Sequence, residues 1–183
     1  MFFTEEIYYK AMNFAGEAHH AQFMPGSTIP YVTHLANVCM EVVTALTYSS
    51  SHSLNGDLLV CSALLHDVLE DTPVSYTEVE ALFGTEVAKG VAALTRNTLL
   101  PEAEQIPDSL QRILRQPVEI RMVKMADRID NLRQNPLLWS NSQRKAYQNE
   151  AQLILKTLGG CNLYLEEQLK KKINSYNQYL EVV

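Results

Sequence analysis

Four polar residues follow a stretch of sequence that is almost entirely apolar. His66, Asp67, Glu70 and Asp71 come directly after Leu58–Leu65. On a continuous helix successive residues are about 100° apart, so these four would share one arc about 140° wide. Carboxylates packed together against apolar surroundings repel each other and lose hydration, which favours a bound cation. Glu70 and Asp71 alone are equally consistent with a solvated helix end, but the adjacent His-Asp pair is harder to explain in that way.

Two other segments carry polar residues that suit the same chemistry. Lys124, Asp127 and Asn131 recur at helical spacing, opposite a face rich in Met, Ile and Leu. His34 stands near the start of an earlier helical pattern, shortly after Tyr31. Taken singly, such a stripe is usually a solvated helix face and such a histidine is usually structural. Their occurrence beside a His-Asp pair favours a shared site.

A site made from these residues would offer nitrogen and oxygen ligands to a metal ion. Imidazole and carboxylate suit Mn²⁺, Fe²⁺, Co²⁺, Ni²⁺ or Zn²⁺, and the lack of thiolates argues against structural zinc. Four protein ligands leave open positions in an octahedral site for water and a substrate oxygen. A cation so placed lowers the pKa of water and polarises a phosphoryl oxygen, which is hydrolytic chemistry.

The elements that must position these residues are predicted to be helices. Pro, Gly and polar clusters divide the chain, and apolar residues recur at helical spacing between them. The segment with the His-Asp pair is apolar nearly all round, which predicts a buried central helix. We predict helices over Thr4–His20, Thr33–Leu46, Asp57–Asp71, Ser75–Leu82, Gly84–Leu94, Leu110–Arg115, Val118–Arg133 and Ser142–Leu158, with a last amphipathic helix beyond Gly160, and irregular chain over Phe23–Pro30 and Thr95–Ser109.

The fold class that follows is all-α, a single-domain helical bundle around that central helix. A chain of 183 residues is long enough to bury one substantial core. We expect the domain to occupy residues 1–160. Residues 161–183 are expected to form a C-terminal helix that packs on the domain or on a partner.

The composition of the chain limits which binding partners and which cellular compartment are expected. The net charge of −6 argues against a protein that coats nucleic acid or an anionic membrane, since both need a basic face. Three scattered cysteines do not suggest a disulfide framework. With no signal-peptide pattern and no apolar run long enough to span a bilayer, a cytoplasmic protein is expected. A homo-oligomer remains open.

The order and spacing of several motifs resemble a known family. The motifs are Tyr31-Val-Thr-His34, Ala63-Leu-Leu-His66-Asp67-Val-Leu-Glu70-Asp71-Thr72, Phe83-Gly84, Val91-Ala-Ala-Leu-Thr95 and Val123-Lys-Met-Ala-Asp127-Arg-Ile-Asp-Asn131-Leu-Arg133. Together they resemble the HD-domain hydrolases of the Rel/Spo type, especially the stand-alone small alarmone hydrolases. The resemblance spans roughly residues 10–135 and implies an HD-type helical fold.

The resemblance also implies an activity and a metal. It implies one Mn²⁺ held by His34, His66, Asp67 and Asp127, and removal of the 3′-pyrophosphate of (p)ppGpp as a unit. Glu70 and Asp71 would be the catalytic residues that position or activate the attacking water. The substrate-binding candidates are Asn131, which matches a position lining the nucleotide pocket, together with Tyr31 and Lys124.

Two departures from the family pattern concern the substrate. Where the family usually has basic pairs, this chain has Phe23-Met-Pro-Gly26 and, after Pro101, Glu102-Ala-Glu-Gln-Ile106. Lys124, Arg128 and Arg112 are the candidates to replace the missing cations. Two alternatives therefore stay open: an HD nucleotidase or phosphatase that releases orthophosphate from another nucleotide, and a nucleotide-binding regulatory module without turnover.

Overall fold

The structure, a computed structural model, describes residues 3–49, 54–134 and 139–180. In these residues the chain forms α-helices, a final 3₁₀ turn, and one isolated bridge between Phe23 and Pro30, which confirms the all-α class. The helices are α1 (Glu5–Ala18), α2 (Val32–Thr47), α3 (Gly56–Leu65), α4 (Val68–Asp71), α5 (Tyr76–Phe83), α6 (Thr85–Leu94), α7 (Glu102–Ile113), α8 (Val118–Asn131), α9 (Asn141–Leu158) and α10 (Leu163–Ser175), followed by the 3₁₀ turn Tyr176–Tyr179.

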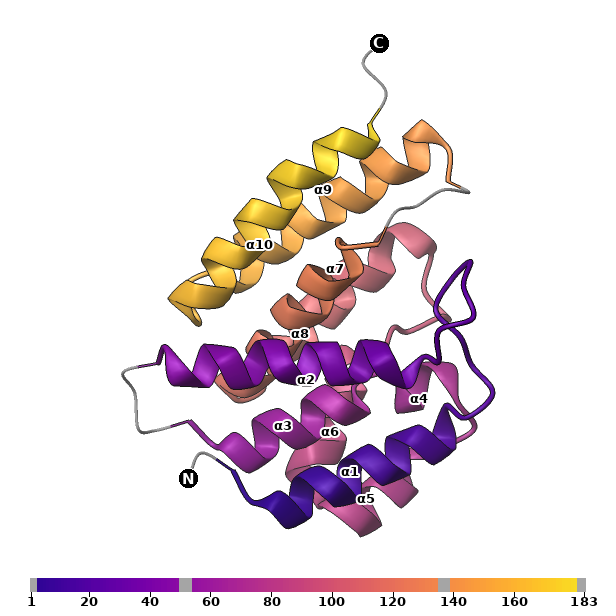
Figure 1. The fold of residues 1–183 in the computed structure, drawn as a ribbon, viewed down its shortest axis with the longest axis vertical. Helices are drawn as coiled ribbons and strands as arrows, with labels where there is room; N and C mark the ends of the chain where they lie inside the picture. Colours follow the sequence, from indigo (N-terminus) through magenta and orange to yellow (C-terminus); the bar gives the residue numbers. More distant parts are fainter. Residues whose placement is uncertain (1–2, 50–53, 135–138, 181–183) are drawn as a thin grey trace.

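The centre of the molecule is formed by α2, α3 and α8, which pack against one another (Figure 1). Helix α3 also packs on α1 and α6, so Leu58–Leu65 has apolar partners on every side and is buried, as its composition predicts. Helices α9 and α10 form an antiparallel pair at one end of the molecule (Figure 1), and both contact α8. Among the described residues, no helix is both long enough and apolar enough to cross a membrane.

The central helix is not continuous through the His-Asp pair, so the predicted helix Asp57–Asp71 is wrong in this respect. Helix α3 ends at Leu65, and α4 begins at Val68. In a continuous helix the carbonyl of Ala63 would accept the backbone N–H of Asp67. Here Nδ1 of His66 donates to that carbonyl at 2.8 Å instead. The side-chain N–H of His66 therefore replaces a backbone N–H as the donor to this carbonyl, and the chain turns at the His-Asp pair.

The region before α8 differs from prediction as well. Thr95–Ser109 was expected to be irregular with a short helix after it, but α7 runs over Glu102–Ile113 with Pro107 inside it. The proline loses one backbone hydrogen bond. The helix persists because Ile106, Leu110 and Ile113 are buried on one face, and tertiary packing of an amphipathic face outweighs such a local loss.

Candidate metal centre and its cleft

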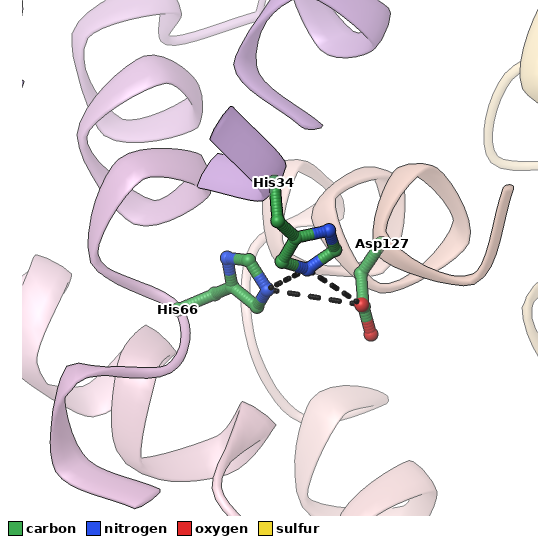
Figure 2. A group of neighbouring side chains, drawn as sticks. All are labelled: His34, His66 and Asp127. Carbon is green, nitrogen blue, oxygen red and sulfur yellow. Dashed lines mark hydrogen bonds and ion pairs between the residues drawn. The ribbon is translucent and has the colours of Figure 1, made fainter. Parts of the chain in front are cut away.

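Three segments far apart in the sequence bring the predicted ligands together. His34 lies in the first turn of α2, His66 and Asp67 in the turn between α3 and α4, and Asp127 in α8. Figure 2 shows His34, His66 and Asp127 pointing toward one another. Their exposed fractions are only 1%, 2% and 5%, so unpaired polar groups here would be costly.

The distances between ligand atoms suit a common cation. Nε2 of His34 lies 3.3 Å from Nε2 of His66 and 3.5 Å from Oδ1 of Asp127. Oδ2 of Asp67 lies 2.9 Å from Nε2 of His66 and 3.7 Å from Nε2 of His34. Ligands that each lie about 2.0–2.2 Å from a transition metal are themselves separated by about 3–3.6 Å. His34, His66 and Asp127 are therefore spaced as ligands of one ion would be, and Asp67 lies beside the two histidines.

Hydrogen bonds on the far side of each imidazole orient the two rings. Nδ1 of His34 contacts Oδ2 of Asp130 at 2.7 Å, and Nδ1 of His66 contacts the carbonyl of Ala63 at 2.8 Å. The partner of each Nδ1 is a carboxylate or carbonyl oxygen, which accepts, so each Nδ1 carries the hydrogen and each Nε2 presents a lone pair. The two nitrogen lone pairs and the two carboxylates face one another. A divalent cation can bind to all of these groups.

The pKa values of these groups reflect the same concentration of negative charge. Burial lowers the pKa of His34, but hydrogen bonds to Asp127 and Asp130 outweigh that effect and raise it to about 9. Burial opposes the charge on His66 in the same way, yet the charge of Asp67 and hydrogen bonding to Asp127 leave its pKa well above the ordinary value. Without a metal ion the site attracts protons, as expected of a centre built to hold positive charge.

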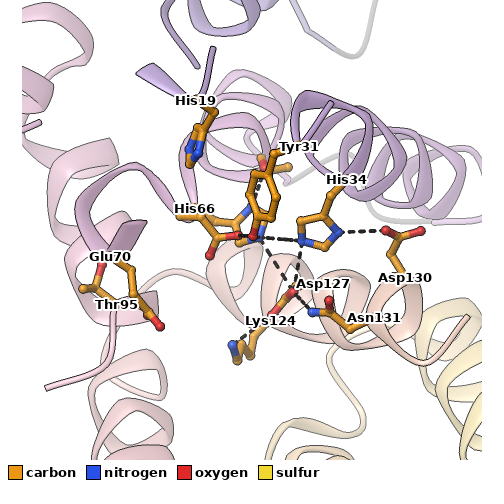
Figure 3. Close-up of polar contacts among 12 residues, drawn as sticks. His19, Tyr31, His34, His66, Glu70, Thr95, Lys124, Asp127, Asp130 and Asn131 are labelled. Atoms are coloured by element: carbon orange, nitrogen blue, oxygen red, sulfur yellow. Dashed lines mark hydrogen bonds and ion pairs between the residues drawn. The ribbon is translucent and has the colours of Figure 1, made fainter. Parts of the chain in front are cut away.

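The substrate-binding candidates all contact the carboxylates of this centre (Figure 3). The hydroxyl of Tyr31 donates to Oδ2 of Asp67 at 2.7 Å. Nζ of Lys124 donates to Oδ2 of Asp127 at 2.9 Å, and Nδ2 of Asn131 donates to Oδ1 of the same residue. Each of the three candidates therefore orients a predicted ligand, and each also lines the cleft beside it.

The two catalytic candidates lie on the α4 side of that cleft. Glu70 accepts a hydrogen bond from the backbone N–H of Arg96 at 2.8 Å, and its Oε1 lies 3.5 Å from Nε of the same arginine. The backbone carbonyl of Asp71 accepts a hydrogen bond from Nε2 of Gln22 at 2.6 Å, which fixes the end of α4. Burial raises the pKa of both carboxyl groups, and Arg96 offsets part of that effect at Glu70. A raised pKa suits a group that accepts and releases a proton.

The cleft has a volume of about 460 Å³, within the range of small-molecule sites. One wall comes from Trp139 and α9. The lining residues are Tyr31, Asp67, Glu70, Asp71, Arg96, Glu102, Lys124, Asp127, Arg128, Asn131, Trp139, Gln143, Ala146, Tyr147 and Glu150. The candidate metal centre thus adjoins a cleft whose charged lining residues are mainly acidic.

Several residues of this site were not singled out from the sequence. Asp130 is three positions after Asp127, and that spacing on a buried helix was an available signal. Arg96 had no such signal, because it follows α6 in a loop. His19 is buried, and its ring stacks on Tyr31 with centroids 5.1 Å apart. His20 is exposed, and His52 lies outside the described residues.

Comparison with known proteins gives a consistent set of relatives. The sequence profile of the HD domain matches residues 11–160. The chain is 32% identical to the guanosine-3′,5′-bis(diphosphate) 3′-pyrophosphohydrolase MESH1 of Danio rerio, over 88% of this chain and 89% of that protein. It is 33% identical to the enzyme of the same name from Drosophila melanogaster, over 76% of this chain and 77% of that protein. A solved structure described as a metazoan orthologue of SpoT that hydrolyses ppGpp superposes with a TM-score of 0.80 at 26% identity, over 94% of this chain and 97% of that one.

Proposed function

This chain belongs to the HD-domain family, and from that membership and the geometry of its centre we propose that it removes the 3′-pyrophosphate of guanosine-3′,5′-bis(diphosphate) or a close relative. The observation that supports the proposal is the meeting of His34, His66 and Asp127 at ligand spacing, with Asp67 beside the two histidines and with Glu70 and Asp71 in the same cleft. The named activity of the MESH1 relatives, which match the chain along most of its length, supports the same substrate.

The four ligand side chains would hold a divalent cation, which we propose to be Mn²⁺. Mn²⁺ accepts mixed imidazole and carboxylate ligands and leaves positions for water and phosphate oxygen, so it would lower the pKa of water and polarise the phosphoryl group. Asp130 and the carbonyl of Ala63 hold the two imidazoles with Nε2 toward the centre. Tyr31, Lys124 and Asn131 hold the carboxylates, which keeps the ligands in place before substrate arrives.

In the reaction a water oxygen attacks the phosphorus bonded to O3′. The bond between that phosphorus and O3′ breaks, so the products are GDP and pyrophosphate. We assign to Glu70 the acceptance of a proton from the attacking water, because burial raises its pKa and its carboxylate faces the cleft. Asp71, next to it, orients the same water. A proton is returned to O3′ as the ribose leaves.

The direct test is incubation of metal-stripped protein with guanosine-3′,5′-bis(diphosphate), with and without Mn²⁺, followed by anion-exchange chromatography. We expect GDP and pyrophosphate in equal amounts, only when Mn²⁺ is added. Asp67→Ala should lose both Mn²⁺ binding and turnover, whereas Glu167→Ala, which removes an exposed carboxylate on α10, should lose neither.

Two other outcomes would redirect the assignment. Orthophosphate in place of pyrophosphate would show a phosphatase acting on the same class of nucleotide. Tight binding of the nucleotide without turnover, in protein that binds Mn²⁺, would show a regulatory module. Each result contradicts the proposed reaction and leaves the metal centre in place.

A further inference from the structure

The cleft has more negative than positive side chains, which is unexpected for a site that would take a polyphosphate. Among the described residues that line it are six carboxylates and three basic side chains. Glu102, from the segment that lacks the family's basic pair, is one of the carboxylates. A bound divalent cation would neutralise only part of this charge. The phosphate groups of a substrate therefore need a further cationic partner from the protein.

Two of the three basic residues are already committed to other groups. Lys124 donates to Asp127, and only 10% of its side chain is exposed. Arg128 has 2% of its side chain exposed, pairs with Glu150 at 3.1 Å and stacks its guanidinium on Tyr147, 4.1 Å from the ring centroid. Both residues stabilise the walls of the cleft. The Nε and Nη1 atoms of Arg128 have no hydrogen-bond partner among the described residues but are buried, so both cations are far less accessible from the cleft than Arg96.

Arg112, also considered as a replacement for the missing cations, does not line the cleft. Its guanidinium donates to the carbonyls of Ala92 and Ala93 at the end of α6, and its Nη2 donates to the carbonyl of Thr95 at 2.7 Å. Arg112 thus fixes the backbone immediately before Arg96 from one side.

Arg96 is placed differently. Its backbone N–H is anchored on Glu70, while its Nε contacts the same carboxylate only at 3.5 Å, and 37% of its side chain is exposed. The peptide unit between Thr95 and Arg96 is therefore held at both its carbonyl and its N–H, and the guanidinium remains accessible at the cleft. An exposed surface pair of this length contributes little free energy and is readily exchanged for a phosphate, which offers bidentate acceptors.

We propose that Arg96 is a specificity-determining residue, whose guanidinium binds the phosphate groups at the 3′ end of the substrate. The inference rests on the proposed function. The 3′ end is assigned because Arg96 lies against Glu70, which acts on the water that attacks the 3′ phosphorus. In this chain Arg96 supplies the positive charge that the segments around Phe23 and Glu102 lack.

The test compares initial rates of Mn²⁺-loaded wild type, Arg96→Ala and Arg96→Lys, with Arg115→Ala as a control that removes an exposed arginine outside the cleft. Loss of a hydrogen bond to a charged group predicts a KM for guanosine-3′,5′-bis(diphosphate) about 10- to 100-fold higher in Arg96→Ala. We expect kcat to change much less, because the backbone N–H that holds Glu70 is retained. Arg96→Lys should recover part of the loss, and Arg115→Ala should match wild type.

Inhibition by GDP, which has no 3′ phosphates, identifies the end of the substrate that Arg96 contacts. We expect its inhibition constant to be the same in wild type and Arg96→Ala; an equal weakening for GDP and substrate would overturn the assignment to the 3′ end. A fall in kcat at unchanged KM would instead show that Arg96 only orients Glu70, and would refute the inference.

If wild type does not turn over the nucleotide, the proposed function fails, and calorimetric titration of the same nucleotide then tests Arg96 by itself. Weaker binding by Arg96→Ala than by Arg115→Ala would uphold its role as a phosphate ligand. Equal binding would refute it.

Discussion

Replacement of Asp130 by Asn tests whether the orientation of His34 sets the affinity for metal. Oδ2 of Asp130 lies 2.7 Å from Nδ1 of His34, and both residues are almost completely buried. An amide oxygen at this position still accepts the hydrogen bond, so the ring keeps its place. The imidazole loses a negative partner that makes its other nitrogen a better electron donor.

The size of the effect follows from the type of contact. Loss of a group that orients a metal ligand typically lowers affinity about 10- to 100-fold, equivalent to about 1.4–2.8 kcal/mol. Asp130→Ala removes the acceptor as well as the charge and should weaken binding more than Asp130→Asn. Competition with a fluorescent Mn²⁺ indicator measures both dissociation constants, and thermal unfolding followed by circular dichroism checks that the fold is retained.

Asp57→Asn is the matched control, because Asp57 also accepts a hydrogen bond, from the backbone N–H of Thr4 at 2.6 Å, but at the far end of α3. It should alter stability without altering Mn²⁺ affinity. If folded Asp130→Asn binds Mn²⁺ as tightly as wild type, then Asp130 does not tune His34 and the reasoning from its geometry is wrong.

Three further outcomes are expected. Glu70→Gln should bind Mn²⁺ normally but lower kcat about 100- to 10,000-fold in the chromatographic assay, since it can no longer accept a proton; an unchanged kcat would remove Glu70 from the mechanism. The pKa of His34 is raised from 6.5 to about 9, so in metal-free protein its protonation stabilises the fold below pH 6.5, and that stability is lost as the pH rises through 9. Urea unfolding in EDTA should show this decline, and a stability that rises over the interval would contradict it. Burial raises the pKa of Cys39 and of Cys61 to about 12, so both thiols should react with a disulfide reagent at pH 8 only after unfolding; rapid labelling of folded protein would show that they are accessible.

Much of the helical architecture could be predicted because its causes are local. The apolar run Leu58–Leu65 identifies a buried helix from composition alone, and the proline and glycine positions divide its neighbours. The predicted ligands His34, His66 and Asp127 lie within ligand distance of one another, with Asp67 beside the two histidines, although the sequence argument placed His66 and Asp67 on a continuous helix. The chain instead turns at this pair, between α3 and α4.

The features that the sequence did not predict depend on tertiary or side-chain contacts. At the turn, the side chain of His66 donates a hydrogen bond to the backbone carbonyl of Ala63. The spacing of apolar residues in the sequence does not reveal such a contact. Helix α7 contains Pro107, a residue that predicts a helix end, and it persists through burial against the rest of the fold. Arg96 lines the cleft beside Glu70, which is 26 residues earlier in the sequence and accepts its backbone N–H.

The wide spacing of the ligands along the chain has a consequence for the lifetime of the protein. His34 is 32 residues from His66 and 96 residues from Asp130, the carboxylate that orients it. An ion held by these segments acts as a removable cross-link that joins α2, the α3–α4 turn and α8, and it binds the folded chain in preference to the unfolded one. Withdrawal of the ion should therefore increase the fraction of molecules that open transiently and are cut by proteases. Metal supply would then set the abundance of the protein as well as its activity.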